Sequence, residues 1–378
     1  MKKVMIIAGE ASGDQHAALL VGAVHEKQPD IEFFGIGGEK MRAAGVETLV
    51  DAAEMAVVGL IEVLAHRKVI FGALNQMRAL LLERNPELLI LVDYPEFNLR
   101  LARDAKAAGI KVLFYISPQV WAWRQKRVHT IRERVNMMAV VFPFEADFYQ
   151  QHQVPVRYVG HPLVNEVKSS KPRPELLTEF SLQTEQPVVG IFPGSRKSEI
   201  KRLLPILMKA ARIIHQQQPE VQFVMPLAST MNEAFLNLDT DPLRSHIKII
   251  PRRSYDVIEV CDAIMTVSGT VTLEIALMQK PMVIINKVAW LTYYIVRRML
   301  KIKHLGLCNI VADQRLVPEL IQHDAKPDLI ANAVLRFLHD DDYRQNTIAT
   351  LQIVKERLGD IDATEQVADL TLEMLGVV

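Results

Sequence analysis

A glycine, a hydroxyl and a guanidinium follow one another in the motif Phe-Pro-Gly-Ser-Arg at 192–196. A short apolar run precedes this motif, and a helix is predicted to begin near Glu199. Backbone amides at a helix N-terminus attract anions, and hydrogen bonds to charged groups contribute about 1.5–3 kcal/mol each. We therefore predict that Gly194, Ser195 and Arg196 bind a pyrophosphate group. A capped helix that carries a surface arginine is the alternative.

A second turn of this kind has the sequence Val-Ser-Gly-Thr-Val-Thr-Leu-Glu at 267–274. The small residues Ser268, Gly269 and Thr270 leave space beside the backbone, and Glu274 falls about one turn into the next predicted helix. A carboxylate accepts hydrogen bonds from two neighbouring hydroxyls, as in dinucleotide-binding folds. Glu274 is thus the candidate for binding a ribose, and a solvated glutamate in a first helical turn is the alternative.

The loop Gly-Glu-Ala-Ser-Gly-Asp at 9–14 follows the first apolar run and opens a helix. Its glycines let a ligand approach backbone amides that favour anions or hydroxyls. The binding candidates for an acceptor or its phosphate are Gly9, Ser12 and Gly13, and the further catalytic candidates are Glu10 and Asp14. An ordinary turn capped by Ser12 is the alternative. The loop is not a Gly-x-Gly-x-x-Gly fingerprint, so NAD is disfavoured and no cofactor is predicted.

Two carboxylates end an apolar run in the segment Leu-Val-Asp-Tyr-Pro-Glu-Phe-Asn at 91–98. The first of them, Asp93, falls where a buried strand meets the edge of its sheet. A carboxylate there can take a proton from an attacking hydroxyl, which contributes on the order of 10² to 10⁴ in rate. Asp93 is the leading candidate for a general base, followed by Glu96. A strand-end aspartate that only organises the turn is the alternative.

Tryptophans and cations stand together in the segment Ser-Pro-Gln-Val-Trp-Ala-Trp-Arg-Gln-Lys-Arg at 117–127. Aromatic residues among cations occur in nucleic-acid-binding proteins. This block is isolated, however, and the 44 Lys and Arg residues of the chain balance its 44 Asp and Glu residues. A phosphorylated sugar or lipid headgroup fits better, and no nucleic-acid partner is predicted. The acceptor candidates in this block are Trp123, Arg124, Gln125 and Lys126.

Two Asp-x-Asp patterns, at 239–241 and 360–362, match the motif by which metal-dependent sugar transferases bind a diphosphate through a divalent ion. Neither follows a buried strand. We interpret both as turn and cap residues, so no metal is predicted. Arg196 and helix N-termini must then neutralise the charge of a leaving diphosphate.

These motifs require a scaffold, and short apolar runs alternate with helical periodicity along the chain. The runs occupy 4–8, 31–36, 88–92, 111–116, 138–142, 188–192, 221–225, 247–250, 263–267 and 281–285. Runs without polar alternation indicate parallel strands covered on both faces. The predicted fold is α/β, with two Rossmann-like doubly wound domains facing across a cleft. Beyond Lys326 only helices are predicted.

A length of 378 residues suits two domains with separate cores. The best linker candidate is the polar, proline-containing stretch 169–186. We predict an N-terminal acceptor domain at 1–168 and a donor domain at 187–350. The C-terminal helices at 351–378 are expected to pack back on the N-terminal domain or on a partner chain.

The composition favours a cytoplasmic protein. Cys261 and Cys308, without metal-ligand spacing, are expected to be reduced thiols. The first apolar run is too short for a signal peptide and fits a strand, and no run is long enough for a membrane-spanning helix. Basic, aromatic and apolar residues mix in the stretches 55–82 and 287–304, which suits helices lying in a bilayer interface. Helices packed on their own sheets would have a similar pattern.

Together, the segments 8–14, 117–127, 192–196 and 268–274 resemble the lipid-A-disaccharide synthase family in their order and spacing. The resemblance implies a two-domain glycosyltransferase of the B type, peripherally bound at the cytoplasmic face of the inner membrane of Gram-negative bacteria. The implied reaction joins UDP-2,3-diacylglucosamine to 2,3-diacylglucosamine 1-phosphate, releasing UDP and forming a β-1,6 disaccharide. Because the donor is α-linked, the reaction inverts the anomeric centre, which requires one displacement and one base.

By position, the resemblance assigns the family's Gly-Ser-Arg loop to 194–196, its ribose acid to Glu274 and its essential strand-end aspartate to Asp93. It also implies that Asn309 lies near the donor. Some relatives carry aspartate where this chain has Glu96, so Glu96 ranks below Asp93. The family also forms homodimers through its C-terminal part, which suits the C-terminal helices.

Two other functions fit parts of the pattern. A UDP-N-acetylglucosamine 2-epimerase would have the same two-domain shape but a soluble substrate, which leaves the two membrane-facing stretches without a purpose. A nucleotide-sugar sensor would need Arg196 and Glu274 but neither Asp93 nor an acceptor site. Release of UDP with and without the acceptor would separate these functions.

Overall fold

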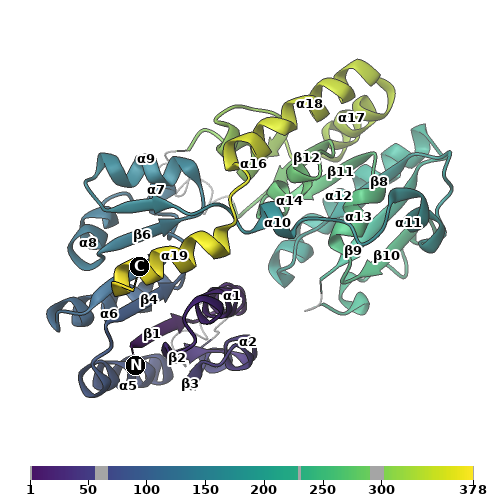
Figure 1. Cartoon of the computed structure of the whole chain (residues 1–378). Helices are drawn as coiled ribbons and strands as arrows, with labels where there is room; N and C mark the ends of the chain where they lie inside the picture. The colour runs from purple at the N-terminus through teal and green to yellow at the C-terminus, as the bar shows by residue number, and fades with distance from the viewer. Residues whose placement is uncertain (1, 56–66, 229–230, 290–301, 378) are drawn as a thin grey trace. The chain divides into compact units, whose positions relative to one another are not determined.

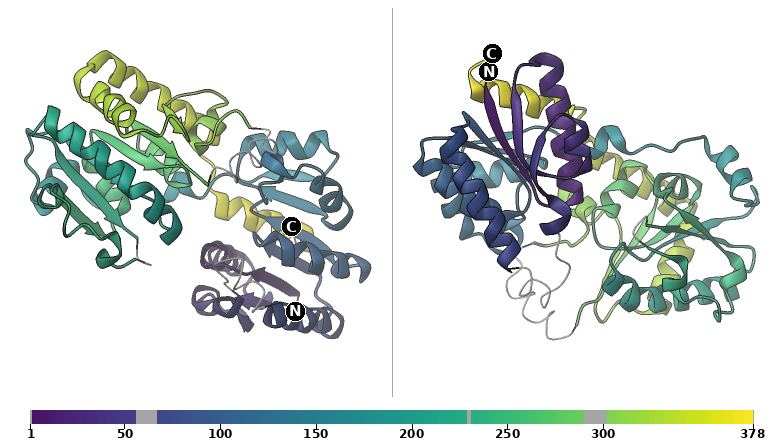
Figure 2. Two further views of the ribbon diagram at one scale, coloured as in Figure 1. Left: turned by 180° about the vertical axis from the view of Figure 1, so that it is seen from behind. Right: turned by 90° about the horizontal axis from the view of Figure 1, so that it is seen from below.

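The computed structural model describes residues 2–55, 67–228, 231–289 and 302–377 (Figure 1). Two compact units form: the first contains Met1–Pro162 and Asp360–Val378, and the second contains Leu163–Gly359. Each unit has a parallel sheet with helices on both faces, as the two further views in Figure 2 show. The predicted α/β class with two Rossmann-like sheets is confirmed.

The first unit is built on a seven-stranded sheet. Its strands are β1 Lys3–Ala8, β2 Glu32–Gly37, β3 Glu47–Asp51, β4 Leu88–Val92, β5 Lys111–Tyr115, β6 Met137–Val140 and β7 Val156–Tyr158. Their order is β3-β2-β1-β4-β5-β6-β7. Its helices are α1 Ala11–Lys27, α2 Glu39–Ala43, α3 Ala52–Met55, α5 Arg67–Arg84, α6 Pro95–Ala107, α7 Val120–Trp123, α8 Arg127–Arg134, α9 Pro143–Gln151 and α19 Ala363–Leu375. Every residue of β4 is buried because helices cover both faces of the sheet.

The second unit has a six-stranded sheet, and its strands again run parallel. Its strands are β8 Val188–Phe192, β9 Gln222–Leu227, β10 Ile247–Pro251, β11 Ala263–Val267, β12 Met282–Asn286 and β13 Glu319–Ile321. Their order is β10-β9-β8-β11-β12-β13. The helical elements are α10 Leu163–Glu166, α11 Arg173–Glu179, α12 Lys197–Gln217, η1 Glu233–Leu236, η2 Arg244–His246, α13 Ser254–Val260, α14 Val271–Leu277, α16 Leu307–Ala312, α17 Pro327–His339 and α18 Asp341–Leu358.

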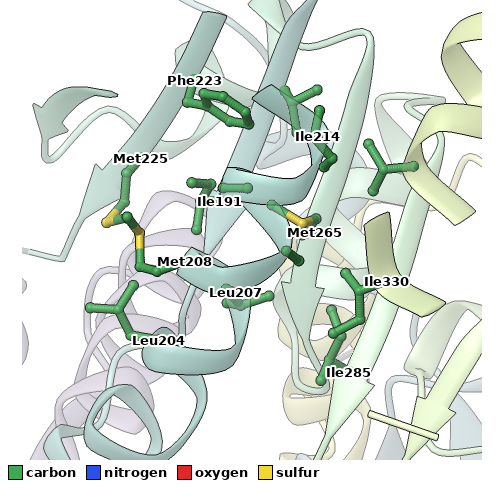
Figure 3. Close-up of a cluster of buried hydrophobic side chains, with 14 of the residues drawn as sticks. Ile191, Leu204, Leu207, Met208, Ile214, Phe223, Met225, Met265, Ile285 and Ile330 are labelled. Carbon is green, nitrogen blue, oxygen red and sulfur yellow. The ribbon is translucent and has the colours of Figure 1, made fainter. Parts of the chain in front are cut away.

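Helix α12 illustrates how the core of the second unit forms. Its buried residues, among them Leu204, Leu207 and Ile214, recur at helical spacing and make one face of the helix apolar. Figure 3 shows this face beside strand residues such as Ile191 and Met265. The cluster holds β8 and β11 in place, and so it positions the loops that follow these two strands.

The C-terminal helices are divided between the two units. Helices α17 and α18 belong to the second unit, whereas α19 belongs to the first and packs on α1. Lys27 of α1 pairs with Glu365 and Asp369 of α19 at 2.6 and 2.7 Å. Lys2 donates a hydrogen bond to the carbonyl of Leu375, so both ends of the chain lie in the first unit (Figure 1).

The unit boundary falls at Pro162 and not within the predicted linker 169–186. That stretch contains α11 and is bound to the second sheet, because Arg173 pairs with Asp262 at 2.9 Å and Asp262 also accepts from the amide of Val188 at 2.8 Å. The second boundary lies at Gly359 because α18 runs through the predicted break at 350. Strands β3, β7 and β13 are missing from the sequence-based prediction.

Much of the two stretches predicted to meet a membrane, 55–82 and 287–304, lies outside the described residues. Within the described part, α5 exposes Val69 and Phe71 by 40 and 43%. None of the helices that the structure describes has the length and apolar character needed to span a bilayer.

Candidate active-site residues

A pocket of about 320 Å³ lies in the second unit where β8 and β11 end. These two strands pair in the middle of the sheet, at the point where the strand order reverses. Ligands of open α/β sheets bind at such a switch point, beyond the carboxyl ends of the strands. All predicted donor residues except Asn309 line this pocket, namely Gly194, Ser195, Arg196, Ser268, Gly269, Thr270 and Glu274.

The loop after β8 places its arginine at the start of a helix. Gly194 has a φ of +98°, a left-handed conformation that favours glycine. Arg196 is the N-cap residue of α12, and its side chain is 79% exposed. The guanidinium pairs with Glu199 at 3.1 Å. Because such an exposed ion pair is weak, Arg196 can exchange Glu199 for an anion that enters the pocket.

The loop after β11 leaves its backbone open beside the pocket. An added Cβ at Gly269 would meet no atom within 4 Å, and the hydroxyl of Ser268 accepts a hydrogen bond from Asn286 at 2.5 Å. Burial, and then the charge of Glu166, raises the pKa of Glu274 to about 7. Glu274 therefore exists in both protonation states near neutral pH, and a carboxyl group in either state can bind sugar hydroxyls.

Asn309, which the resemblance places near the donor, is completely buried and is not among the residues that line the pocket. Its Oδ1 accepts from the amides of Leu316 and Val317 at 2.8 and 3.2 Å. Its Nδ2 donates to the carbonyl of Val317 at 3.1 Å and to the carboxylate of Glu319 at 2.9 Å. Asn309 thus holds the chain between α16 and β13 in place.

The leading base candidate lies at the corresponding switch point of the first sheet. Strands β1 and β4 are neighbours, with Ala8 opposite Val92, so the loop after β1 and the turn after β4 adjoin. Burial, and then the nearby charge of Glu10, raises the pKa of Asp93 to about 6. A base with this pKa is ionised at neutral pH yet can hold a proton, as general-base catalysis requires.

The turn that carries Asp93 has an unusual backbone. Asp93 and Tyr94 both have left-handed φ values, +49° and +44°, which residues other than glycine rarely adopt. Asn98 holds the turn by donating to the carbonyl of Asp93 at 2.7 Å. The ring of Tyr94 packs on Gly9, where an added Cβ would lie 2.7 Å from the ring. Gly9 is therefore needed for packing against Tyr94.

Asp14 has the contacts of a capping residue, although it was among the catalytic candidates. Its carboxylate is buried and accepts from the amides of Gly38, Lys40 and Met41 at 2.6, 3.1 and 3.2 Å, at the start of α2. Three such bonds occupy the carboxylate. Asp14 therefore fixes the loop between β2 and α2.

The two other acceptor candidates of this loop, Ser12 and Gly13, differ in their exposure. Ser12 lies exposed in the first turn of α1, where it can meet a ligand, whereas Gly13 is buried. An added Cβ at Gly13 would lie 3.5 Å from the Cβ of Ala8, an ordinary packing distance. Ser12 does not cap the helix, because Glu10 is the N-cap residue.

The tryptophan block presents one aromatic ring and several cations to solvent. Trp123 is 44% exposed, and the guanidinium of Arg124 lies 4.2 Å from the centre of its ring. Gln125 donates to the carbonyl of Trp121 at 3.0 Å, and Lys126 is exposed. Glu96 forms ion pairs with Arg124 and with Arg127. Glu96 is thus exposed and its carboxylate is occupied by two cations, so it ranks below Asp93 as a base candidate.

Comparison with known proteins decides the family. A profile of the lipid-A-disaccharide synthetase family matches residues 4–369 of the chain. The chain is 52% identical to a lipid-A-disaccharide synthase of Geobacter sulfurreducens over 99% of its length and 97% of the relative. It is 53% identical to the enzyme of the same name in Nitrosococcus oceani, over 98 and 96% of the two chains. The chain belongs to the lipid-A-disaccharide synthase family.

Membership of the lipid-A-disaccharide synthase family makes the chain a glycosyltransferase of lipid A biosynthesis. Solved structures with a similar fold include the S. aureus MnaA–UDP complex, with a TM-score of 0.68 and 12% identity over 100% of this chain and 98% of the other. The calicheamicin glycosyltransferase CalG4 has a TM-score of 0.60 and 14% identity over 100 and 98%. At these identities the likeness shows the fold alone.

One buried acid near the tryptophan block is missing from the predicted site. Glu145 is 1% exposed, and it accepts from the indole of Trp121 at 2.9 Å and from the amide of Phe142 at 3.2 Å. Burial raises the pKa of Glu145 to about 8. The sequence signal was a glutamate in the first turn of α9, which alone predicts only a capping residue.

The Asp-x-Asp patterns have structural partners. Asp241 pairs with Arg212 at 2.5 Å, and Asp362 caps α19 by accepting from Thr364 and Glu365 at 2.9 and 3.1 Å. Within the described ranges, no three His, Cys, Asp or Glu side chains lie close enough to one another to hold a metal ion.

Proposed function

We propose that this member of the lipid-A-disaccharide synthase family joins UDP-2,3-diacylglucosamine to 2,3-diacylglucosamine 1-phosphate. The products are UDP and the β-1,6-linked disaccharide 1-phosphate. The observation that carries the proposal is the pocket of the second unit, because two loops separated by some seventy positions of sequence bring their glycines, hydroxyls, Arg196 and Glu274 into one cavity.

The donor would bind in this pocket through its nucleoside diphosphate. Arg196 would leave Glu199 and pair with the diphosphate, to which the first amides of α12 also donate. Glu274 would bind the ribose hydroxyls. Ser268, Gly269 and Thr270 also line the pocket, and the open space beside Gly269 would admit a ligand close to the backbone.

The chemistry would be a single displacement with inversion. The 6-hydroxyl of the acceptor attacks the anomeric carbon of the donor while Asp93 accepts the hydroxyl proton. The bond between that carbon and the diphosphate oxygen breaks, and UDP leaves with the electron pair. Arg196 and the N-terminus of α12 stabilise the charge that develops on the diphosphate. Glu10 keeps the pKa of Asp93 raised and thereby strengthens it as a base.

The acceptor would bind to the first unit near the tryptophan block. Its phosphate carries negative charge, and Arg124, Gln125 and Lys126 offer hydrogen-bond donors beside the exposed ring of Trp123. We further propose peripheral association with the cytoplasmic face of the inner membrane, because both substrates carry acyl chains. We also propose that the chain forms a homodimer through its C-terminal part.

The test is release of UDP from UDP-2,3-diacylglucosamine by the purified full-length protein in mixed detergent micelles. We expect release only when 2,3-diacylglucosamine 1-phosphate is present, with the disaccharide 1-phosphate identified by mass spectrometry. Epimerisation of UDP-N-acetylglucosamine without an acceptor would favour the epimerase instead. Binding of UDP without any turnover would favour a nucleotide-sugar sensor.

A further inference from the structure

We propose that Thr272 is a positioning residue that sets the conformation of the donor loop, defined here as residues 268–274. This inference rests on the proposed function, in which the pocket bordered by that loop binds UDP. Thr272 is completely buried and does not line the pocket. It therefore acts on a ligand only through the backbone of the loop.

The hydroxyl of Thr272 connects the loop to a different helix. It donates to the carbonyl of Gly269 at 2.8 Å and accepts from the amide of Leu307 at 3.0 Å. The first bond is a local one that threonines near helix starts often form. The second bond is not local, because Leu307 begins α16, thirty-five residues further along the chain. One hydroxyl thus fastens the donor loop to the start of α16.

The start of α16 is itself held by a buried carboxylate. Glu319, at the beginning of β13, accepts from the amide of Gly306 at 2.9 Å and from the amide of Leu305 at 3.0 Å. Gly306 lies against Ile284 of β12, where an added Cβ would be 2.3 Å from the side chain. Asn309 also donates to Glu319, at 2.9 Å. The start of α16, to which Thr272 is bound, is therefore held firmly against strands β12 and β13 of the sheet.

The bond to Gly269 fixes a peptide unit at the pocket wall. The carbonyl of Gly269 accepts from both the amide and the hydroxyl of Thr272, at 3.1 and 2.8 Å. Because the peptide is planar and trans, a fixed Gly269 carbonyl also fixes the direction of the Thr270 amide. Both residues line the pocket, and the open space at Gly269 leaves the loop without side-chain packing on that side. The order of this wall thus depends on Thr272 behind it.

The experiment measures UDP binding to the full-length protein by titration calorimetry. Thr272→Val keeps the shape of the side chain but removes the hydroxyl, and Thr272→Ser keeps the hydroxyl. Thr347→Val is the matched control, because Thr347 is 3% exposed and its hydroxyl donates within its own helix, to the carbonyl of Tyr343 at 2.8 Å. Thermal unfolding of each variant is recorded alongside.

We expect Thr272→Val to weaken UDP binding about tenfold, the factor that corresponds to one ordinary buried hydrogen bond. Thr272→Ser and Thr347→Val should bind UDP within about twofold of the unchanged protein. In turnover, Thr272→Val should raise KM for the donor more than it lowers kcat, since the loop would bind ground state and transition state alike. If both Thr272→Val and Thr347→Val lose thermal stability but only Thr272→Val binds UDP more weakly, the result would support the positioning role.

Several results would overturn the proposal. Unchanged UDP binding by Thr272→Val would do so, as would an equal loss in Thr272→Ser, which would show that binding depends on side-chain packing at this position and not specifically on the hydroxyl. If Thr272→Val does not fold, Thr272→Ala takes its place, and failure of both to fold would make Thr272 a folding residue only. Absence of UDP binding by the unchanged protein is a separate result, which would refute the donor pocket of the proposed function and this inference with it.

Discussion

The raised pKa of Asp93 leads to a prediction about the acid side of the pH profile. As the proposed general base, Asp93 must be ionised to accept a proton, and burial together with Glu10 places its pKa at about 6. Activity should therefore decrease as the pH falls through 6, because the base becomes protonated. At pH 5 only about one tenth of the enzyme would carry an ionised Asp93, so kcat should fall about tenfold per pH unit below 6.

Removal of the Glu10 charge should shift the acid limb of the kcat–pH profile to lower pH. Burial is the larger cause of the raised pKa and Glu10 the next, so Glu10→Gln should lower the pKa of Asp93 only part of the way to its ordinary value of about 3.9. The acid limb of the Glu10→Gln profile should therefore lie below pH 6. At pH 5, Glu10→Gln should retain a larger fraction of its own plateau kcat than the unchanged enzyme retains of its plateau. Asp93→Asn should lose on the order of 10² to 10⁴ in kcat on the pH plateau above 6.

The assay is UDP release in mixed micelles from pH 4.5 to 8, at saturating donor. Saturation matters because Glu274, whose pKa lies at about 7, would otherwise add its own titration through donor binding. Glu83→Gln is the control, since Glu83 is an exposed acid on α5 and its removal changes the net charge equally. An acid limb that stays in place in Glu10→Gln, or Asp93→Asn with near-normal kcat, would refute the assignment of the base.

Three further results are expected. Arg196→Ala should abolish turnover without changing the thermal unfolding temperature, and near-normal turnover would contradict the diphosphate assignment. Glu274→Gln should weaken UDP binding about ten- to a hundredfold in calorimetry, the factor for one lost hydrogen bond to a charged group, whereas unchanged binding would exclude a ribose contact. Asp14→Ala should lower the free energy of unfolding of the first unit by about 2 kcal/mol in urea, while UDP binding to the second unit stays unchanged; a loss of UDP binding would contradict this capping role.

The predicted strands were those with continuous apolar runs, and the missing ones have a common cause. Strands β3, β7 and β13 each lie at the edge of a sheet, and most of their residues are only half-buried. A strand with one neighbour and a partly exposed face does not need the uninterrupted apolar run of β4 or β11. Pattern alone therefore identifies the centre of each sheet better than its edges.

The site shows a similar division between what local sequence determines and what it does not. Glycine and hydroxyl residues after a buried strand predict a ligand-binding turn, and the loops at 194–196 and 268–270 do meet in one pocket. The identity of a polar residue does not reveal its burial, however, and Asn309 proved to be enclosed by the backbone that it holds. The role of Thr272 depends on Leu307, a partner that folding brings close and that no local motif contains.

The same topology explains why the candidate residues gather as they do in each unit. In both sheets the strand order reverses next to the first strand of the unit, between β1 and β4 and between β8 and β11. At such a reversal the loops after the two strands leave in opposite directions and leave room between them. Asp93 and Glu10 occupy this position in the first unit, and Arg196 and Gly269 occupy it in the second. The fold thus dictates which loops can carry chemistry, and side-chain differences at these loops separate members of the fold that share little sequence.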